Sequence, residues 1–259
     1  MTSPIWQAVY GEGPLVASAI HDGHEVRPEV AALLRLNAPQ RRYEEDPFTG
    51  EWTSIAPTRI IGLRSRFEVD LNRPRETAVY RRPEDAWGLD VWKLPPSADV
   101  VARSLAEYDE FYAHWKRLLE RMVGRHGRVV VFDLHSYNHR RQGPDAPPAD
   151  PDQNPEINLG TRSLDRVRWS PVIERFLAEL RSDADLGGSL NVRENVKFFG
   201  GHLAQWTHAT FPETVCVLAI EVKKTFMDEW TGQLDRVRFN AIHAALARAA
   251  AGIADLLVN

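Results

Sequence analysis

The chain is poor in the features that mark secreted or membrane-spanning proteins. Its 259 residues include a single cysteine, Cys216, so an internal disulfide is impossible. Cys216 lies in the apolar run 215–220, which favours core packing over a nucleophilic role. No segment approaches the ~18 apolar residues of a membrane-spanning helix, and residues 1–7 lack the pattern of a secretory signal. We therefore expect a cytoplasmic protein.

The chain also lacks an excess of charge of one sign. Its formal net charge is −4 and its isoelectric point is near 6.2. This balance gives no reason to expect nucleic acid or an anionic membrane as a partner. Hydrophobic residues make up 43% of the chain, an ordinary share for a soluble globular protein, and the length is sufficient for one large α/β domain.

Apolar segments alternate with helical patterns along the chain. The expected strands are residues 15–20, 67–71, 129–134 and 215–222, and the clearest expected helices are residues 102–123, 170–180 and 234–258. The segment 142–155 is rich in proline and aspartate, which predicts an exposed loop. We predict one α/β domain over residues 1–259, in which a mixed, largely parallel sheet lies between helices on both faces, giving three layers.

Two histidines follow segments that the pattern predicts to be buried strands. His21 comes directly after the apolar segment 14–20, and His135 directly after the strand predicted at 129–134. A lone histidine beside a strand is usually a hydrogen-bonded core or surface residue. A pair of them at strand ends, where open α/β sheets place their chemistry, favours a single zinc ion. Asp133 could then hydrogen-bond a histidine ligand.

An acidic cluster at residues 44–46 offers candidates for a third metal ligand. A site with two histidines still needs a carboxylate if it is to resemble the zinc sites of hydrolases. Asp46, followed by Pro47, is the first choice and Glu45 the second, while Glu44 and Glu25 stay open as alternatives. Without the histidines, the same cluster would indicate only a solvated loop.

Polar and apolar residues alternate from residue 66 to residue 71, which predicts a strand. Arg66 lies on this segment, and Asn72 and Arg73 follow it. An arginine fork beside an asparagine is a suitable receptor for a substrate carboxylate. The alternative is a surface strand in which Glu68 and Asp70 form ion pairs with the arginines.

Glu221 interrupts an otherwise apolar segment, because six apolar residues precede it and Val222 follows it. A carboxylate in such a segment is costly unless it has a partner or a chemical task. Metallohydrolases use a glutamate to take a proton from water and return it, which makes Glu221 a candidate general base. The alternative is a strand-end glutamate paired with Lys223 or Lys224.

Taken together, these segments resemble the N-formylglutamate amidohydrolase family, a branch of the zinc carboxypeptidase and aspartoacylase-like hydrolases. The resemblance runs from about residue 15 to residue 232, and its most specific part is the Ser-Arg-x-x-x-Asp-x-Asn-Arg pattern at residues 65–73. The other matching segments are His21-Asp22-Gly23, Glu44-Glu45-Asp46-Pro47, Asp133-Leu134-His135-Ser136, Gly200-Gly201-His202 and the strand that contains Glu221.

The resemblance implies a phosphorylase/hydrolase-like fold and a zinc-dependent amidohydrolase that cleaves an N-acyl amino acid, such as an N-formyl amino acid, beside a free carboxylate. His21 and His135 would bind the zinc ion with an acidic ligand, and Glu221 would be the general base and acid. Arg66 would stabilise the oxyanion or a second carboxylate. The residues expected to contact the substrate are Asn72, Arg73, His202 and His208.

Two other functions stay open at this point. One is a carboxypeptidase-like enzyme that acts on short peptides or cell-wall fragments, which would use the same metal and carboxylate clamp in a longer cleft. The other is a non-catalytic carboxylate-binding protein with the same fold. Product analysis would separate the two enzymes, and metal content would separate both from the binding protein.

Overall fold

A mixed seven-stranded sheet is the centre of the part of the chain that the computed structural model describes, residues 4–181 and 190–258. The strand order is β1-β3-β2-β4-β7-β5-β6, and four of the neighbouring pairs are parallel. The antiparallel pairs are β1–β3 and β5–β7. The strands are β1 (Trp6–Val9), β2 (Leu15–Ala19), β3 (Thr58–Gly62), β4 (Val129–Tyr137), β5 (Ile157–Gly160), β6 (Val192–Glu194) and β7 (Val215–Lys223).

The two long strands β4 and β7 lie side by side in the middle of the sheet. Every residue of β4 is buried, and in β7 only Glu221 is partly exposed. Near-continuous apolar sequence of this kind is typical of parallel strands that are covered on both faces. The parallel register places His135 opposite Glu221, so the two polar side chains singled out in the sequence are neighbours.

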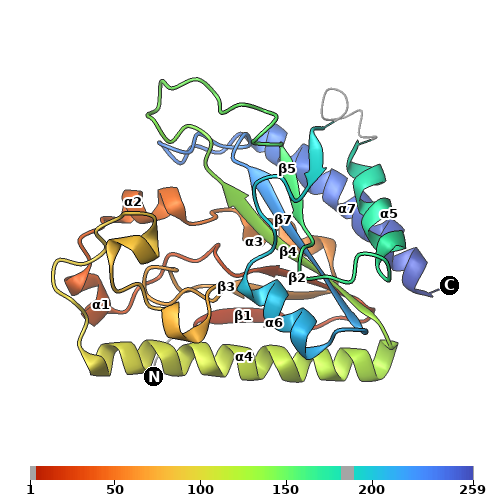
Figure 1. Cartoon of the computed structure of the whole chain (residues 1–259), viewed down its shortest axis with the longest axis horizontal. Helices are drawn as coiled ribbons and strands as arrows, with labels where there is room; N and C mark the ends of the chain where they lie inside the picture. Colours follow the sequence, from red (N-terminus) through yellow and green to blue (C-terminus); the bar gives the residue numbers. More distant parts are fainter. Residues whose placement is uncertain (1–3, 182–189, 259) are drawn as a thin grey trace.

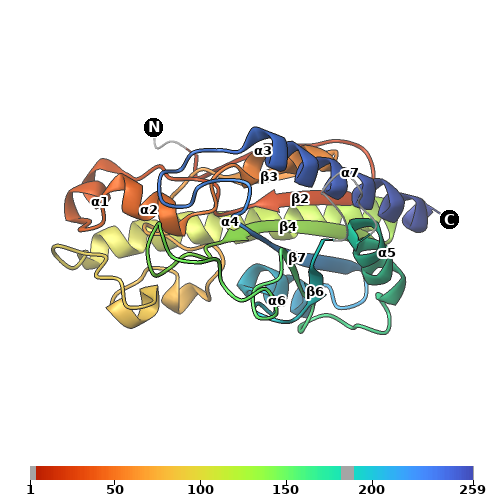
Figure 2. The ribbon, with the colours of Figure 1, turned by 90° about the horizontal axis from the view of Figure 1, so that it is seen from above.

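Helices cover both faces of the sheet, as Figures 1 and 2 show. On one face, Phe111 and Trp115 of α4 share an apolar cluster with Val131 of β4. On the other face, Phe176 of α5 shares a second cluster with Phe132 of β4. The first face is covered by the long helix α4 (Ala98–His126) and the shorter α6 (His202–Thr210). The second face is covered by the long helices α5 (Ser170–Arg181) and α7 (Arg236–Val258).

Short helices connect β2 to β3 and β3 to α4. They are α1 (Pro28–Leu33), α2 (Ala38–Glu44), α3 (Thr49–Trp52) and the 3₁₀ turns η1 (Thr53–Ile55), η2 (Arg75–Thr77) and η3 (Pro83–Ala86). In Figure 1, α1 and α2 lie at one end of the molecule, beside the ends of the central strands, whereas α3 lies close to the strands themselves. This placement brings the connecting segments to the edge of the sheet where the polar side chains lie.

The predicted fold class is confirmed, because a mixed, mostly parallel sheet lies between two helical layers. The three long helices are also confirmed, with small differences at their ends. Helix α4 is longer than predicted: it begins after Ser97, whose side chain accepts a hydrogen bond from Val100 N, and ends at Gly127 with a φ of 74°. The segment 142–155 contains no helix or strand, as predicted.

The strand predicted at residues 67–71 is wrong. The segment is a buried turn, in which Glu68 N donates to Ser65 O. The alternation misled the prediction because the polar residues are buried as deeply as the apolar ones: Glu68 is 1% exposed and Asp70 is fully buried. Each carboxylate is paired with an arginine. The alternation of polar and apolar residues therefore does not indicate a strand in a sheet with one solvent-exposed face.

The four short strands β1, β3, β5 and β6 were not predicted. Each has three to five residues, too few for the pattern to stand out from the surrounding loops. Within the described residues, no helix is both long enough and apolar enough to span a membrane.

Candidate active site

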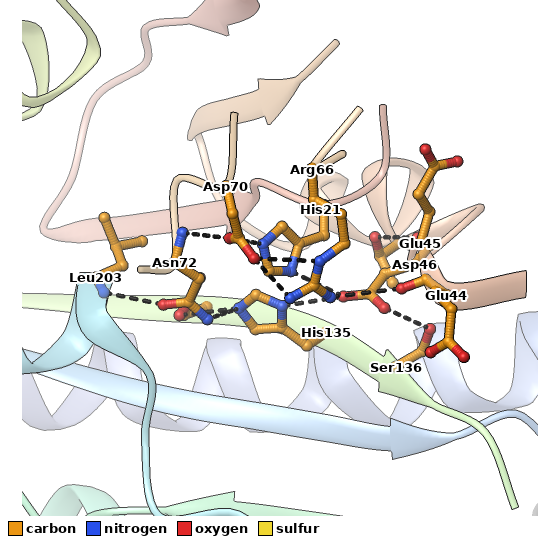
Figure 3. A network of polar contacts seen from close by, with 12 residues as sticks. His21, Glu44, Glu45, Asp46, Arg66, Asp70, Asn72, His135, Ser136 and Leu203 are labelled. Carbon is orange, nitrogen blue, oxygen red and sulfur yellow. Dashed lines mark hydrogen bonds and ion pairs between the residues drawn. The ribbon is translucent and has the colours of Figure 1, made fainter. Parts of the chain in front are cut away.

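The central strands bring the predicted residues together at one edge of the sheet. His21 lies two residues beyond the end of β2, while His135 on β4 and Glu221 on β7 are paired in register. Asp46 follows helix α2, and its backbone N–H donates to His21 O at 3.0 Å, which holds the acidic segment against the end of β2. Figure 3 shows the resulting network.

The centre of this network is Asp46, which faces both imidazole rings. Its Oδ2 atom lies 3.0 Å from Nδ1 of His135 and 3.5 Å from Nδ1 of His21. The ring centroids of the two histidines are 4.9 Å apart. All three side chains are buried. Two nitrogens and one carboxylate oxygen therefore meet at one point.

The second nitrogen of each histidine faces another carboxylate. His21 Nε2 lies 2.7 Å from Oδ1 of Asp70, and His135 Nε2 lies 3.1 Å from Oδ2 of Asp133. Asp133 is itself held by a hydrogen bond of 2.8 Å from Ser18 Oγ. Metal-binding histidines usually donate their other ring nitrogen to such a group, which fixes the tautomer and the direction of the ring.

The charges of this cluster favour a positive charge at its centre. Burial alone would raise the pKa of Asp46, but hydrogen bonds from His135 and His21 hold that pKa below its usual range. Burial disfavours the charged form of His135, yet Asp133 and Asp46 raise its pKa well above the ordinary value. The negative charge that raises the pKa of His135 also favours a bound cation at the same point.

His21, Asp46 and His135 therefore fit a metal ion. One ligand atom from each lies within 4.8 Å of the others, and nitrogen and carboxylate ligands in this combination suit zinc. The Nδ1 atoms face the common point, while Asp70 and Asp133 keep the two rings oriented. The set leaves room for a further ligand, as catalytic zinc sites require.

The other acidic candidates lie outside this cluster. Glu45 points away and accepts a hydrogen bond from Ser65 Oγ, and burial raises its pKa to about 7. Glu44 binds Arg141 through two hydrogen bonds of 2.9 and 3.0 Å. Glu25 is exposed and forms a backbone bridge to Arg64. The structure thus brings Asp46, the first choice among these acids, to the two histidines.

Glu221 faces the cavity next to His135. Burial raises its pKa to about 8, while His135 lowers it and Asp46 raises it. The lysines that offered a structural explanation bind other groups: Lys223 Nζ donates to Asn154 O, and Lys224 Nζ donates to two backbone carbonyls. A carboxylate beside the candidate metal ligands is thus available for proton transfer.

A cavity of about 400 Å³ opens beside the cluster. Its wall contains His21, Asp46 and Glu221, together with the arginines Arg66 and Arg73. Arg66 is partly buried and forms an ion pair with Asp70, at 2.8 Å, and it also donates to Tyr80 OH at 3.2 Å. Arg73 has looser polar contacts, and its side chain is more exposed than that of Arg66.

Asn72 connects the site to the N-terminus of α6. Its Oδ1 accepts a hydrogen bond of 2.9 Å from Leu203 N, and its Nδ2 lies 3.5 Å from His135 Nε2. A Cβ atom at Gly201 would lie 2.3 Å from the Asn72 amide, so the second glycine of the Gly-Gly pair is needed for this close approach. His202, the first residue of α6, lines the cavity.

His208 does not line this cavity. It is a buried residue of α6, where its Nε2 accepts a hydrogen bond of 2.9 Å from Val217 N and its Nδ1 lies 2.8 Å from Ser163 Oγ. Burial lowers its pKa to about 4, so the ring is neutral at ordinary pH. The structure therefore places His208 in the core between α6 and β7, away from the position expected for a substrate contact.

Sequence reasoning missed three residues of the site. Asp70 was considered only as an ion-pair partner, although it stands in the conspicuous pattern at residues 65–73. Lys224 is buried, lines the cavity and donates to Tyr43 O and Glu45 O at 2.7 and 2.8 Å. Trp87 lies in a connecting segment without periodicity, so no sequence signal singled it out.

This combination of fold and site is typical of α/β hydrolases: a His–Asp–His cluster that could hold a metal ion lies with a glutamate beside a cavity, at the ends of the central strands of a mostly parallel sheet. The family model for N-formylglutamate amidohydrolase matches residues 13–227, so the chain belongs to this family and is a hydrolase acting on carbon–nitrogen bonds. This membership favours catalysis over the non-catalytic binding protein considered above.

Solved structures show the same fold. The crystal structure of N-formylglutamate amidohydrolase from Ralstonia eutropha JMP134 has a TM-score of 0.77 to this chain and 17% sequence identity, and the match covers 98% of each chain. The crystal structure of a gene product from Agrobacterium tumefaciens has a TM-score of 0.65 and 17% identity, covering 97% of this chain and 96% of that one. No curated protein sequence matches the chain.

Proposed function

We propose that the chain hydrolyses the amide bond of an N-acyl amino acid with a free carboxylate, with N-formyl-L-glutamate as the first substrate to test, and that it uses one zinc ion. The observation that carries this proposal is that three functions meet in one cavity: the His21–Asp46–His135 cluster, the carboxylate of Glu221 and the guanidinium of Arg73. A metal-dependent hydrolysis of an amide beside a carboxylate uses all three.

The His21–Asp46–His135 cluster would hold the zinc ion, and Asp70 and Asp133 would keep the two imidazoles oriented. When bound, zinc polarises a scissile carbonyl and makes water more acidic, which provides a nucleophile near neutral pH. The chain's own residues then supply proton transfer, orientation and recognition of the substrate.

Glu221 would act first as a base and then as an acid. It takes a proton from the attacking water while the water oxygen forms a bond to the acyl carbon. It then delivers that proton to the amide nitrogen as the carbon–nitrogen bond breaks. For an N-formyl substrate, the products are formate and the free amino acid. The location of Glu221 on the cavity wall, opposite His135 in the register of β4 and β7, supports this role.

Arg73 would bind the substrate carboxylate through its planar fork, with Asn72 and His202 on the same wall of the cavity. Arg66 lines the cavity as well, and its ion pair with Asp70 fixes the direction of its guanidinium. We propose Arg66 as the group that stabilises charge on the carbonyl oxygen, because a fixed donor needs no reorganisation during the reaction.

The size of the cavity favours a small substrate over a peptide. A volume of about 400 Å³ is at the lower end of the range of small-molecule pockets. A peptidase of the kind considered above would need a longer cleft for residues on both sides of the scissile bond.

Formate release from N-formyl-L-glutamate by the purified protein tests the proposal. We expect turnover, loss of turnover with a chelator, and its recovery with zinc but not with calcium. A dipeptide series and N-acetyl-L-glutamate, tested in parallel, separate deformylation from peptidase and general deacylase activity. The exposed Glu76→Gln variant is a control, because its carboxylate lies outside the cavity wall. Faster hydrolysis of dipeptides than of N-formyl-L-glutamate would contradict the assigned substrate.

A further inference from the structure

Trp87 occupies an unusual position at the mouth of the cavity. It ends the turn η3 in the left-handed conformation, with a φ of 54°, and its side chain is 50% exposed. A bulky residue in this conformation costs free energy, and an exposed indole gains little from burial. Neither the turn nor the core explains a tryptophan at this point, yet its ring is part of the cavity wall.

The indole of Trp87 lies against both arginines of the cavity. The guanidinium carbons of Arg66 and Arg73 are 4.8 and 5.6 Å from the centre of the ring. The ring of Tyr80 meets the indole edge-on at 5.9 Å and lies 5.8 Å from the guanidinium of Arg73. Arg73 is therefore near two aromatic rings, at distances where cation–π attraction is effective.

The two arginines depend on these rings to different degrees. Arg66 is fixed by hydrogen bonds of 3.2 and 2.8 Å to Asp70 Oδ2. Among the described residues, the polar groups near the guanidinium of Arg73 are more distant: Asp85 O is 3.4 Å from Nη2, and Asp70 Oδ2 is 4.0 Å from Nε. A long, partly exposed side chain with such loose contacts retains much rotamer freedom. The contact with the rings of Tyr80 and Trp87 is then the main restraint on the direction of the Arg73 guanidinium.

We propose that Trp87 is a positioning residue that sets the preference of this site for anionic substrates. Its indole holds the Arg73 guanidinium in the direction that presents the fork to a carboxylate in the cavity. It also lets Arg66 and Arg73 lie close together, because both cations share one ring and the neighbouring Asp70 carboxylate. The identity of the substrate used to test this rests on the proposed function, whereas the aromatic restraint on Arg73 does not.

The test compares N-formyl-L-glutamate with its dimethyl ester on Trp87→Ala and Trp87→Phe. We expect Trp87→Ala to reduce the preference for the acid, measured as a ratio of kcat/KM values, by about tenfold, mainly through a higher KM. Trp87→Phe keeps an aromatic face and should stay within about threefold of the wild type. Leu94→Ala is the matched control, because Leu94 is an exposed apolar residue of the same connecting segment outside the cavity wall.

A double-mutant cycle identifies Arg73 as the residue through which Trp87 acts. In an Arg73→Ala background, Trp87→Ala should change the preference for the acid by less than about twofold, because the positioned group is already missing. The same loss with and without Arg73, or a Trp87→Ala variant with the wild-type preference, would overturn the proposal.

Calorimetric titration with the same acid and ester, on the protein without added zinc, separates this inference from the proposed reaction. Tighter binding of the acid that is lost in Trp87→Ala and retained in Trp87→Phe supports the positioning role, even if the wild type hydrolyses neither compound. In that case the proposed function fails and the inference stands. Equal affinity of the wild type for acid and ester would refute the inference directly.

Discussion

Two regions of the molecule bury histidine side chains to a similar depth but give them opposite properties. His135, in the site at the ends of the central strands, is 2% exposed, and His208, on the buried face of α6, is 6% exposed. Carboxylates surround His135 and raise its pKa well above the ordinary value. Around His208, the hydrogen-bonding partners are a backbone N–H and a serine hydroxyl, and burial lowers its pKa to about 4.

The difference shows that the partners of a buried imidazole, more than its depth, decide what it can do. At His208, Val217 N–H donates to Nε2, so the ring proton is on Nδ1 and faces Ser163. Both nitrogens are occupied within the fold, and neither is available to a ligand. At His21 and His135, one nitrogen of each ring is oriented by a carboxylate and the other faces Asp46. This second arrangement can exchange a proton for a metal ion.

The largest effect should come from removing a histidine of the site. His135→Ala is expected to lose the zinc ion and, with it, hydrolytic activity, because only His21 and Asp46 remain of the three ligands. His208→Gln should retain zinc, since His208 lies outside the cluster. Elemental analysis and formate release measured on both variants, with circular dichroism as a check of folding, test the comparison. Equal zinc content in His135→Ala and the wild type would rule out this metal site.

Glu221→Gln should show the next largest effect. The substitution keeps the shape of the side chain but removes the base, so kcat should fall by at least ~10²-fold while zinc content is unchanged. Single-turnover kinetics together with metal analysis measure both quantities. A variant with near-normal kcat would mean that Glu221 has only a structural place in β7.

Asp70→Asn sharpens the comparison, because it changes the carboxylate that faces the His21 imidazole and leaves the three candidate metal ligands unchanged. The carboxylate orients His21 Nε2 at 2.7 Å, and loss of such a partner typically weakens metal binding by about 10- to 100-fold. Competition with a chromophoric chelator measures the zinc affinity. Asp109→Asn is a suitable control, because Asp109 is also paired with an arginine but is half exposed on α4. Unchanged affinity in Asp70→Asn would show that His21 needs no carboxylate behind it.

The smallest expected effect is a pH dependence of stability that originates at His208. The folded-state pKa of about 4 lies below the ordinary value of 6.5, so the unfolded chain binds the proton first as the pH falls. The contribution is complete above pH 6.5 and is lost progressively between pH 6.5 and 4. By pH 4.5 the loss of stability should amount to about 2 kcal/mol. Urea unfolding of wild type and His208→Gln at pH 7 and 4.5 measures it, and equal pH dependence in both would contradict the assignment.

The sequence alone was sufficient to predict the sheet class, the long helices and the pairing of two strand-end histidines. These features have strong local signals, because helices α4 and α7 are long and strands β4 and β7 are continuously apolar. Short strands and turns were missed or misread, since a few residues carry little periodicity. The segment 67–71 shows the limit most clearly, because its alternation comes from buried ion pairs instead of a sheet.

The site was less predictable where it depends on contacts between distant segments. Four acids were candidates for the third ligand, and the sequence could not choose among them beyond an order of preference. The backbone hydrogen bond from Asp46 N to His21 O turns Asp46 toward the histidines, while Ser65 draws Glu45 away. The position of His208 was equally unpredictable. Its local sequence does not show whether the imidazole lines the cavity or forms hydrogen bonds with both nitrogens inside the protein.

The sequence by itself determined the chemistry that is possible: two histidines and a glutamate at the ends of buried strands, and an arginine-rich segment between them. The two histidines and the glutamate lie on or just beyond strands whose burial can be read from apolar runs. Only the tertiary structure decided which carboxylate faces the histidines, that Asp70 lies against His21, and that Trp87 lies against Arg73. Such contacts join residues far apart in the chain or in irregular segments, and no local pattern encodes their geometry.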